Sequence, residues 1–257
     1  MKKLKEVLYV IERDVRMFLN HKILLFMRGL WFIAQISLFG LIASRMVIIP
    51  NYFEYYAAGI TVTILYSTAV FIGYDIYEEA EHGIVEYLLS LPISRRKLAI
   101  GRSIGGGLRS FIYVAPLMGI VLALIGVRNP LNFMLAFFSL FLFAFGVAGM
   151  SITIAMGIKS ADKFDILMGA LDALIVRLST VMYPKVFMAQ ANLMYSELAN
   201  INPLTFASEL FRWGAGIEQY LTFEPLLSVL VIVLFFSLFT LIGIIFYERR
   251  LEGGGWQ

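Results

Sequence analysis

One group of residues has the spacing of a catalytic motif. Gly101, Ser103 and Gly105 form a G-x-S-x-G pattern, which serine hydrolases place on a tight turn between a strand and a helix, next to a histidine base. Here the pattern leads into a long apolar run, and the histidines of the chain are His21 and His82. We therefore predict no catalytic residues. We expect Gly105, Gly106 and Gly107 to let the helix approach a neighbour closely or bend, and Gly146, Gly149 and Gly169 in later runs to form packing notches of the same kind.

A second group could suggest a metal. His82 lies beside Glu78, Glu79 and Glu81, but one histidine with acids on a solvated turn is a weak ligand set. The chain has no cysteine and no G-x-x-x-x-G-K-[ST] phosphate-binding loop. We predict no metal site and no cofactor in this chain, and we interpret the acidic turn as a solvated or partner-contacting face.

Three ionisable residues interrupt an apolar run. Asp165 and Asp172 are seven residues apart and so share one face of a helix, whereas Arg177 is five residues further on and points elsewhere. Such groups are costly inside a bilayer and normally face protein or a wet cavity. They could line a polar path for a solute, or they could pair with a neighbouring helix or a second copy of the chain. Both interpretations stay open.

The elements around these groups are membrane helices. Hydrophobic residues make up 60% of the chain and charged residues 15%, whereas soluble domains carry about 25% charged residues. A helix needs about 20 mostly apolar residues to cross a bilayer. Six runs qualify, at residues 30–49, 57–74, 108–127, 131–158, 164–184 and 226–247. We predict an all-α polytopic membrane protein with six transmembrane helices.

The distribution of charge predicts how the chain crosses the membrane. Sixteen of the 21 Lys and Arg residues lie on the side that would carry both termini, and basic loops stay in the cytoplasm. We therefore expect a multi-pass protein of the cell membrane with both termini cytoplasmic. A net charge of +3 confined to loops indicates topology rather than nucleic-acid binding.

Two segments outside the six runs are amphipathic. In residues 1–28, Leu4, Leu8, Ile11, Val15 and Phe18 share one helix face, which predicts a helix in the membrane interface in preference to one packed on a soluble partner. Between runs five and six, residues 183–222 are apolar but broken. The residues that break this segment are Pro184, Asn202 and Pro203. We expect two short helices there, on or dipping into the outer leaflet.

The cytoplasmic segment 78–97 combines a short helix with a basic entry into the third run. Leu88 and Leu91 lie on an apolar face, and Glu86 lies away from it. Pro92 ends this helix, and Ser94 can cap the next one. This helix is too short to cross the bilayer, and the acidic residues before it would keep it in water. We therefore expect its apolar face to contact something outside the bilayer.

This segment resembles the coupling-helix region of ABC type-2 transporter permeases. The pattern is E-x-G-x-x-E-x-L-L-x-L-P-I-S-R, formed by Glu81, Gly83, Glu86, Leu88, Leu89, Leu91, Pro92, Ile93, Ser94 and Arg95. The interface helix, the six runs, and Asn202, Pro203 and Leu204 before the last run extend the resemblance over the chain. The span-five charges Asp165, Asp172 and Arg177 depart from the family pattern.

The resemblance implies a membrane permease subunit of an ATP-driven transporter, usually an exporter. It implies that the coupling helix sits in a cleft of a separate ABC ATPase subunit, which holds ATP and Mg, and that two identical or different permease chains face each other. We expect residues 1–257 to form one transmembrane unit. The other classes considered are an intramembrane enzyme, an ion- or proton-coupled secondary transporter using Asp165 and Asp172, and a non-transporting anchor or sensor. A secondary transporter should often show an internal repeat with broken helices, and no such repeat is visible.

Overall fold

The computed structural model describes residues 2–158 and 160–252, without the side chains of residues 2–4, so the predicted place of Leu4 lies outside it. Throughout the described residues the regular structure is helical. The helices are α1 (Lys2–Asn20), α2 (Lys22–Ala34), the π-helix η1 (Gln35–Gly40), α3 (Leu41–Met46), α4 (Tyr52–Glu81), α5 (Ile84–Ser90), α6 (Arg95–Ile125), α7 (Pro130–Gly157), α8 (Ala161–Arg177), α9 (Lys185–Ala191), α10 (Leu193–Ile201), α11 (Pro203–Ala215) and α12 (Pro225–Glu252).

Five helical segments are long and apolar enough to cross a membrane, which confirms a polytopic membrane protein. They are α2 to α3 (Lys22–Met46), α4, α6, α7 and α12. The 17 residues of α8 rise about 26 Å, less than the ~30 Å of a bilayer core, so a sixth crossing stays a prediction. The first segment begins at Lys22 rather than residue 30 because Arg28 is accommodated in its second turn, over the Phe71 ring at 3.5 Å.

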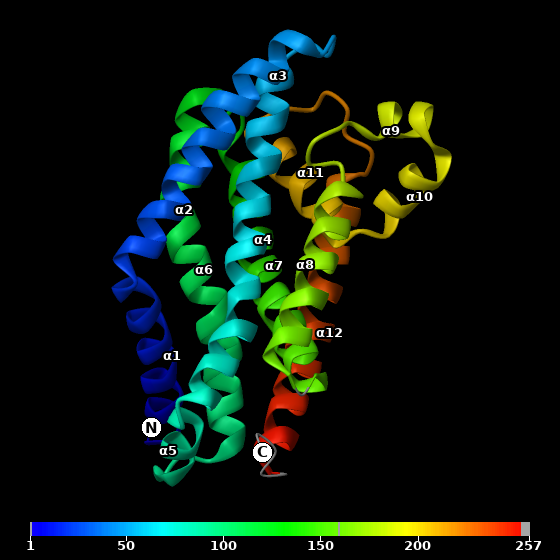
Figure 1. The fold of residues 1–257 in the computed structure, drawn as a ribbon. Helices are drawn as coiled ribbons and strands as arrows, with labels where there is room; N and C mark the ends of the chain where they lie inside the picture. The colour runs from blue at the N-terminus through cyan, green and yellow to red at the C-terminus, as the bar shows by residue number, and fades with distance from the viewer. Residues whose placement is uncertain (1, 159, 253–257) are drawn as a thin grey trace.

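The long helices run alongside one another (Figure 1). The start of α1, the short α5 and the end of α12 lie at one end of the assembly, which we call the α5 end. The helices α3, α9 and α10 lie at the opposite end. Of the five candidate spans, α4 is the most buried, and α2 to α3 and α12 are the least buried. The fold therefore places α4 at its centre and leaves α2 to α3 and α12 as its most exposed spans.

Residues with special backbone preferences set the helix boundaries. Pro50 precedes Asn51, whose left-handed backbone (φ 54°) begins α4. Gly126 (φ 90°) ends α6, where a side chain would strain the backbone. The Asn129 side chain then accepts a hydrogen bond from the Leu131 N–H and caps α7. The residues that end one span and begin the next thus follow from the local sequence.

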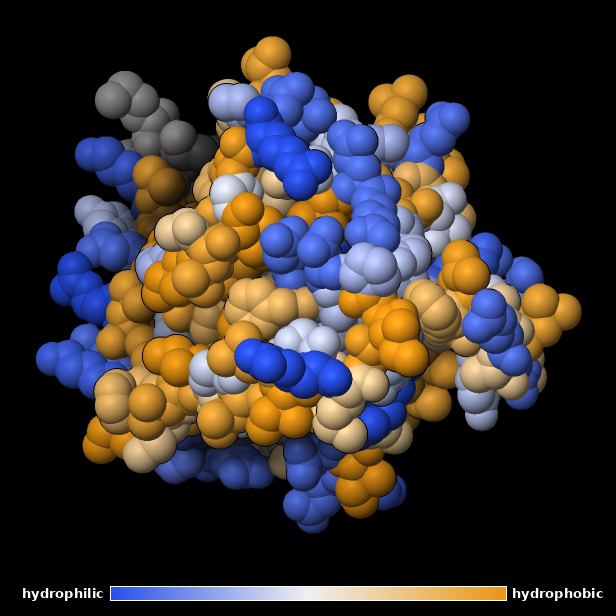
Figure 2. Space-filling view, turned by 90° about the horizontal axis from the view of Figure 1, so that it is seen from above, coloured by the Kyte–Doolittle hydropathy of each residue, from blue (hydrophilic) through white to orange (hydrophobic). Residues whose placement is uncertain are grey.

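The segment before α12 differs from the prediction, because it holds three helices rather than two. The additional break is at Asn192, whose side chain accepts from the Met194 N–H at 2.9 Å and so starts α10. The helices α9 and α10 expose apolar side chains such as Leu193, and hydrophobic residues cover much of this end seen from above (Figure 2). In contrast, α11 is buried among α4, α7 and α12.

Glycines bring α7 and α12 into backbone contact, as expected for membrane helices. A Cβ on Gly149 would lie 2.4 Å from the Phe239 carbonyl oxygen, and one on Gly146 would lie 2.6 Å from the Phe235 ring. The prediction that these two glycines form packing notches is confirmed. The same prediction for Gly169 on α8 is wrong within this chain, because open space surrounds that position.

Candidate functional site

The segment between α4 and α6 forms a tight helical hairpin at the α5 end. Gly83 begins α5 in the left-handed region (φ 68°), a conformation that favours glycine. The helix ends at Ser90 and is followed by the extended Leu91 and then Pro92. Ser94 occupies the N-cap position of α6 but makes no side-chain capping bond. The predicted helix, break and second helix are thus present at the expected residues.

The apolar face of α5 is turned inward, which corrects the expectation that it is offered to a partner. Val85 is fully buried and Leu88 is 5% exposed, both within the core of this chain. The face turned away carries Glu86, Tyr87 and Ser90, and Tyr87 is 63% exposed. Val85 and Leu88 are buried because the loop is short. Both ends of α5 are connected to long helices, so its apolar face packs against them.

The remaining motif residues divide between the two faces. The exposed ones are Glu81, Gly83, Glu86, Pro92, Ser94 and Arg95. Leu89 and Leu91 are half-buried and pack against the core. The outward surface of this hairpin is therefore mainly polar, with Tyr87 as a large exposed aromatic side chain.

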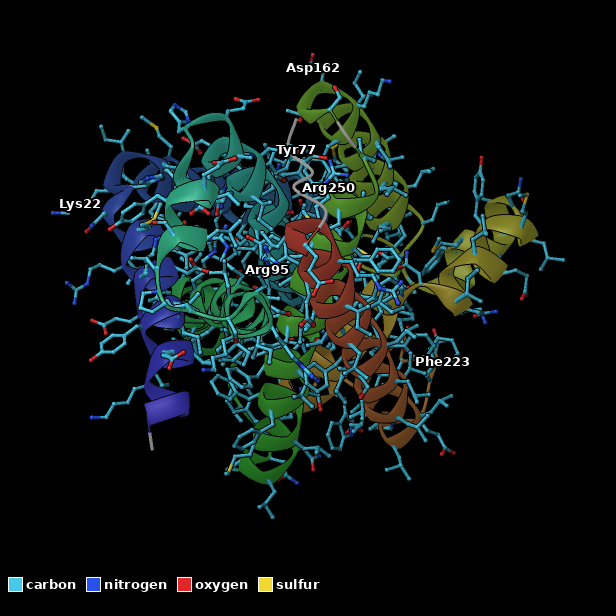
Figure 3. All side chains as sticks on the ribbon, turned by 90° about the horizontal axis from the view of Figure 1, so that it is seen from below. Lys22, Tyr77, Arg95, Asp162, Phe223 and Arg250 are labelled. Carbon is cyan, nitrogen blue, oxygen red and sulfur yellow. The ribbon has the colours of Figure 1, made fainter. Side chains whose placement is uncertain are left out.

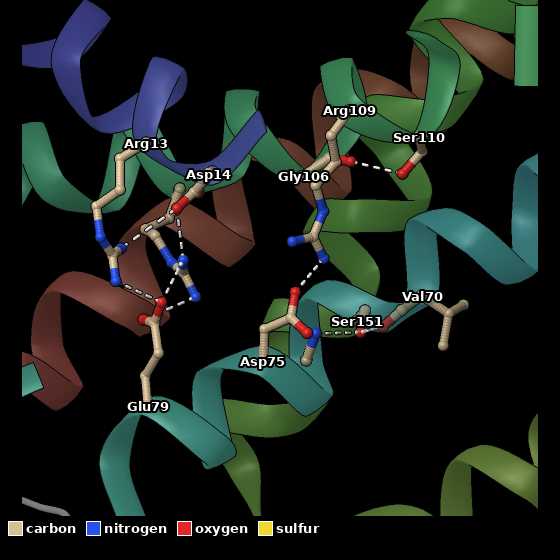
Figure 4. Close-up of polar contacts among 11 residues, drawn as sticks. Arg13, Asp14, Val70, Asp75, Glu79, Gly106, Arg109, Ser110 and Ser151 are labelled. Carbon is tan, nitrogen blue, oxygen red and sulfur yellow. Dashed lines mark hydrogen bonds and ion pairs between the residues drawn. The ribbon is translucent and has the colours of Figure 1, made fainter. Parts of the chain in front are cut away.

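Buried charges hold the elements on either side of α5 together (Figure 4). Arg13 and Asp14 come from α1, Glu79 from the last turn of α4, and Arg102 from the start of α6; we call these four residues the charge cluster. Arg102 Nη1 donates to Asp14 Oδ1 at 2.6 Å and to Glu79 Oε1 at 3.1 Å. Arg13 Nη2 donates to the same Glu79 oxygen at 2.7 Å. Three helices thus meet in one network.

Three residues of the charge cluster are withdrawn from solvent, and Arg13 is half-buried. Asp14, Glu79 and Arg102 are each at most 2% exposed, so Glu79 does not lie on the solvated turn predicted for it, whereas Glu78 and Glu81 do. Burial raises the pKa of the Asp14 carboxyl, and the positive charges of Arg102 and Arg109 oppose that rise. Removing one partner from such a group leaves an uncompensated charge and typically costs about 3–5 kcal/mol. The cluster therefore specifies one relative placement of the three helices.

Two further ion pairs extend the contacts of α6. Arg109 pairs with Asp75, which lies one turn before Glu79 on α4, as Figure 4 shows. Lys97 Nζ donates to Glu6 Oε2 of α1 at 2.7 Å. Ion pairs at several positions along the first half of α6 thus join it to α1 and to α4.

The charge cluster was not among the predicted features, although the sequence carries a signal for it. On a helical wheel Asp14 falls between Val10 and Phe18, and those two residues are the buried contacts of α1. Of the predicted face, Leu8 is 53% exposed. A carboxylate within an apolar stripe predicts a buried cation opposite it, but the sequence alone does not identify Arg102.

Small residues on α6 make room for this arrangement. A Cβ on Gly105 would lie 2.8 Å from a carboxylate oxygen of Asp14. On Gly106 it would meet α4 at 3.0 Å, and on Gly107 it would meet α7 at 2.7 Å. Three successive glycines therefore admit three different neighbours, which confirms their predicted packing role.

The geometry of a hydrolase elbow is not present at the G-x-S-x-G pattern. Ser103 lies inside α6, with helix on both sides, and is fully buried. His82 Nδ1 lies 2.7 Å from the Glu78 carbonyl oxygen at the end of α4. Within the described residues, no group of three or more His, Asp or Glu side chains is arranged to hold a metal.

The charged residues of α8 lie at the periphery. Asp165 is exposed and accepts a hydrogen bond from the Tyr74 hydroxyl of α4 at 3.0 Å. Asp172 is half-buried, and Arg177 is exposed at the end of the helix. Seen from the α5 end, Asp162 at the start of α8 lies at the edge of the assembly (Figure 3). Neither the path interpretation nor the pairing interpretation is tested by this arrangement.

Asn202 joins α8 to α11. Its Oδ1 accepts from the Leu204 N–H at 3.0 Å and so caps α11, with Pro203 in the first turn. Its Nδ2 donates to the carbonyls of Ile175 at 2.7 Å and Leu178 at 3.1 Å, which are otherwise free at the end of α8. One side chain thus caps the end of one helix and the start of another.

Arg212, for which no role was predicted, holds the other side of α11. Arg212 is fully buried, lies 3.5 Å over the Tyr55 ring, and donates from Nη2 to the Val181 carbonyl at 2.8 Å. Its Nε donates to the Tyr55 carbonyl at 3.2 Å. These contacts bind α11 to α4 and to the turn after α8.

A family model described as ABC-2 type transporter matches residues 5–215. The match extends from α1 to the last residue of α11 and so contains the charge cluster, α5 and Asn202. No protein of curated function matches the chain.

Proposed function

Because the chain belongs to the ABC-2 type transporter family, and so is a permease subunit of an ATP-binding cassette transporter, we propose that it works as half of a dimeric exporter driven by a separate ATPase. The observation that carries this proposal is the clamping of α5. A short helix with an exposed polar face is fixed at both ends to α4 and α6, and these are bound to α1 through buried charges.

The proposed ATPase-contacting surface is the outward face of this hairpin. It comprises Glu86, Tyr87 and Ser90 of α5 with Arg95 and Arg96 at the start of α6, all exposed. Tyrosine and arginine are enriched at the energetic centres of protein interfaces. Val85 and Leu88 act indirectly in this proposal, because they seat α5 on its own chain and prevent it from yielding when the ATPase moves.

Rigid transmission is what such a surface requires. A force on α5 reaches α4 and α6 directly, and the charge cluster passes it to α1. If α5 were flexible, ATP-driven closure of two ATPase subunits would move the loop without moving the spans. The buried ion pairs support the coupling role, because separating their partners would leave an uncompensated charge in a buried site.

ATP and Mg would be bound by the partner ATPase, and we propose that this chain has no ATPase site of its own. The family match favours ATP-driven transport over the ion-coupled secondary transporter considered from the sequence. With the ATPase in the cytoplasm, the α5 end and both termini face the cytoplasm across the cell membrane. Basic residues concentrate on the same side of the membrane.

The proposed dimer forms with an identical or a different permease chain. The polar face of α8 is a candidate for the translocation path, because Asp165 is exposed, accepts a hydrogen bond from the Tyr74 hydroxyl, and shares its helix face with the half-buried Asp172. Arg177 would lie at the outer end of this path. Replacement of Asp172 by Asn should then alter transport more than the amount of folded protein, and an equal loss of both would favour the pairing interpretation.

The coupling proposal is tested by recovery of the ATPase with the permease. Tyr87→Ala should weaken association by about tenfold or more, since a buried tyrosine at an interface centre contributes ~2 kcal/mol. Tyr9→Ala is the matched control, because Tyr9 is equally exposed, at 65%, on α1. Undiminished ATPase recovery with Tyr87→Ala, Glu86→Ala and Arg96→Ala combined would refute the proposed surface.

A further inference from the structure

A cavity of about 240 Å³ lies beside the charge cluster and is lined by residues of α1, α2, α4 and α6. Its exposed rim consists of His21, Leu24, Glu78 and His82. The cavity is smaller than the ~300–1,000 Å³ clefts that hold drug-sized ligands. It has room for about eight water volumes at ~30 Å³ each. It suits one compact polar group rather than a whole transported molecule.

The charges around the cavity leave one cation unpaired. Arg102 is paired with Asp14 and Glu79, and Arg109 is paired with Asp75. Within the described part of the chain, both terminal nitrogens of Arg28 are buried and have no hydrogen-bond partner. The guanidinium is held over the Phe71 ring at 3.5 Å, which satisfies its face but none of its N–H donors. The one lining acid outside these pairs, Glu78, is exposed at the rim.

The position of Arg28 indicates where an anion would come from. It lies six residues after Lys22, the first residue of α2, or about 9 Å along the span. With the span beginning at Lys22, that depth is close to the inner boundary of the headgroup region, which is about 5–8 Å thick on each side of the bilayer. The rim is apolar at Leu24, which is 42% exposed on α2, and polar at Glu78 and His82 on α4. The rim thus offers an amphipathic molecule an apolar contact on α2 and a polar contact at the end of α4.

We propose that this cavity binds the phosphate of an anionic lipid headgroup, with Arg28 as its principal donor. A guanidinium binds phosphate with two parallel N–H donors. The lining as a whole is not basic, because Asp14, Asp75, Glu78 and Glu79 face Arg28, Arg102 and Arg109, so the attraction for an anion comes from Arg28, whose charge has no ion pair among the described residues. The inference does not depend on the proposed ATPase coupling, since it rests on the unpaired Arg28 alone. A lipid at this position would brace α1 and α2 against α4.

The test uses the purified full-length chain in detergent with phosphatidylglycerol, phosphatidylcholine or inorganic phosphate added separately. Binding is measured by native mass spectrometry and by the shift in the thermal unfolding midpoint. Phosphatidylglycerol should bind and stabilise the wild type more than phosphatidylcholine does. Arg28→Gln should weaken phosphatidylglycerol binding by about tenfold or more, as expected for the loss of a charge-assisted hydrogen bond.

Two further variants keep the proposal falsifiable. Lys22→Gln removes an exposed positive charge from the same helix and should leave binding within about twofold, so an equal loss would indicate only general attraction to the surface and would overturn the site. If Arg28→Gln does not fold, Arg28→Lys keeps the charge but loses the planar fork, and it should weaken binding several-fold. Equal stabilisation by inorganic phosphate would identify a free anion as the ligand and overturn the lipid assignment. Retained phosphatidylglycerol binding in a folded Arg28 variant would also overturn it.

Discussion

Asp14 Oδ1 and Arg102 Nη1 lie 2.6 Å apart, although the two residues are 88 positions apart in the chain. Both side chains are at most 1% exposed. The ion pair joins the amphipathic N-terminal helix to the helix that leads from α5 into the membrane. Because water cannot replace either partner at this depth, the pair favours a single placement of α1 on α6.

Neutralising this pair should destabilise the fold. We expect Asp14→Asn to lower the free energy of unfolding by about 3–5 kcal/mol, because Arg102 would keep its charge in a buried site. The measurement is denaturant unfolding of the purified protein followed by tryptophan fluorescence. Arg16→Gln is the control, since Arg16 and Glu12 form an exposed pair on the same helix that contributes only ~0.3–0.5 kcal/mol. Equal effects of the two substitutions would contradict a special role for the buried pair.

Leu88 should behave as a core residue and not as a contact for the ATPase. Leu88→Ala is expected to cost about 2–5 kcal/mol of unfolding free energy, the range for emptying a buried leucine site. Leu8→Ala removes a 53% exposed leucine and should cost below ~0.5 kcal/mol. If Leu88→Ala left the unfolding curve unchanged but lost the ATPase, Leu88 would be a direct contact and the inward placement of α5 would be wrong.

Loss of the Asn202 side chain should release the end of α8. An N-cap alone contributes ~1 kcal/mol, and Asn202→Ala also leaves the carbonyls of Ile175 and Leu178 without their donor. We expect a total cost of about 1–3 kcal/mol, together with faster amide hydrogen exchange after Ile175. Asn192→Ala is the comparison, because Asn192 caps only α10 and should cost ~1 kcal/mol without altering exchange in α8.

Gly149→Ala, which adds one methyl group, should push α7 away from α12. A Cβ at Gly149 would lie 2.4 Å from the Phe239 carbonyl oxygen, and such overpacking costs about 1–3 kcal/mol. Gly119 is also inside a long helix but has nothing within 4 Å, so Gly119→Ala should be neutral or stabilising by up to ~1 kcal/mol. Opposite signs in thermal stability would verify the contact, and matching signs would argue against it.

Several features could be predicted because they depend on neighbours in the chain. The apolar runs required helices, since backbone groups in a bilayer must bond within their own segment. Pro92, Asn202 and Pro203 ended or began helices where expected, because their effects act within a few residues. Asn192 was missed because an asparagine caps a helix only when the backbone places its side chain over the first turn.

The direction in which each helix faces required the tertiary structure. The periodicity of α5 defined an apolar face, but only the packing of α4 and α6 shows that Leu88 points inward. Asp14, Glu79 and Arg102 are separated by tens of residues, and a one-dimensional pattern carries no information on which charges meet.

The sequence by itself thus determined a helical membrane protein, most of its helix breaks and the position of α5 in the chain, because bilayer thickness and local backbone chemistry dictate them. The tertiary structure decided which charges are paired, which glycines touch a neighbour, and that the terminal nitrogens of Arg28 find no hydrogen-bond partner among the described residues. These depend on distances between helices, which arise from the whole fold packing at once.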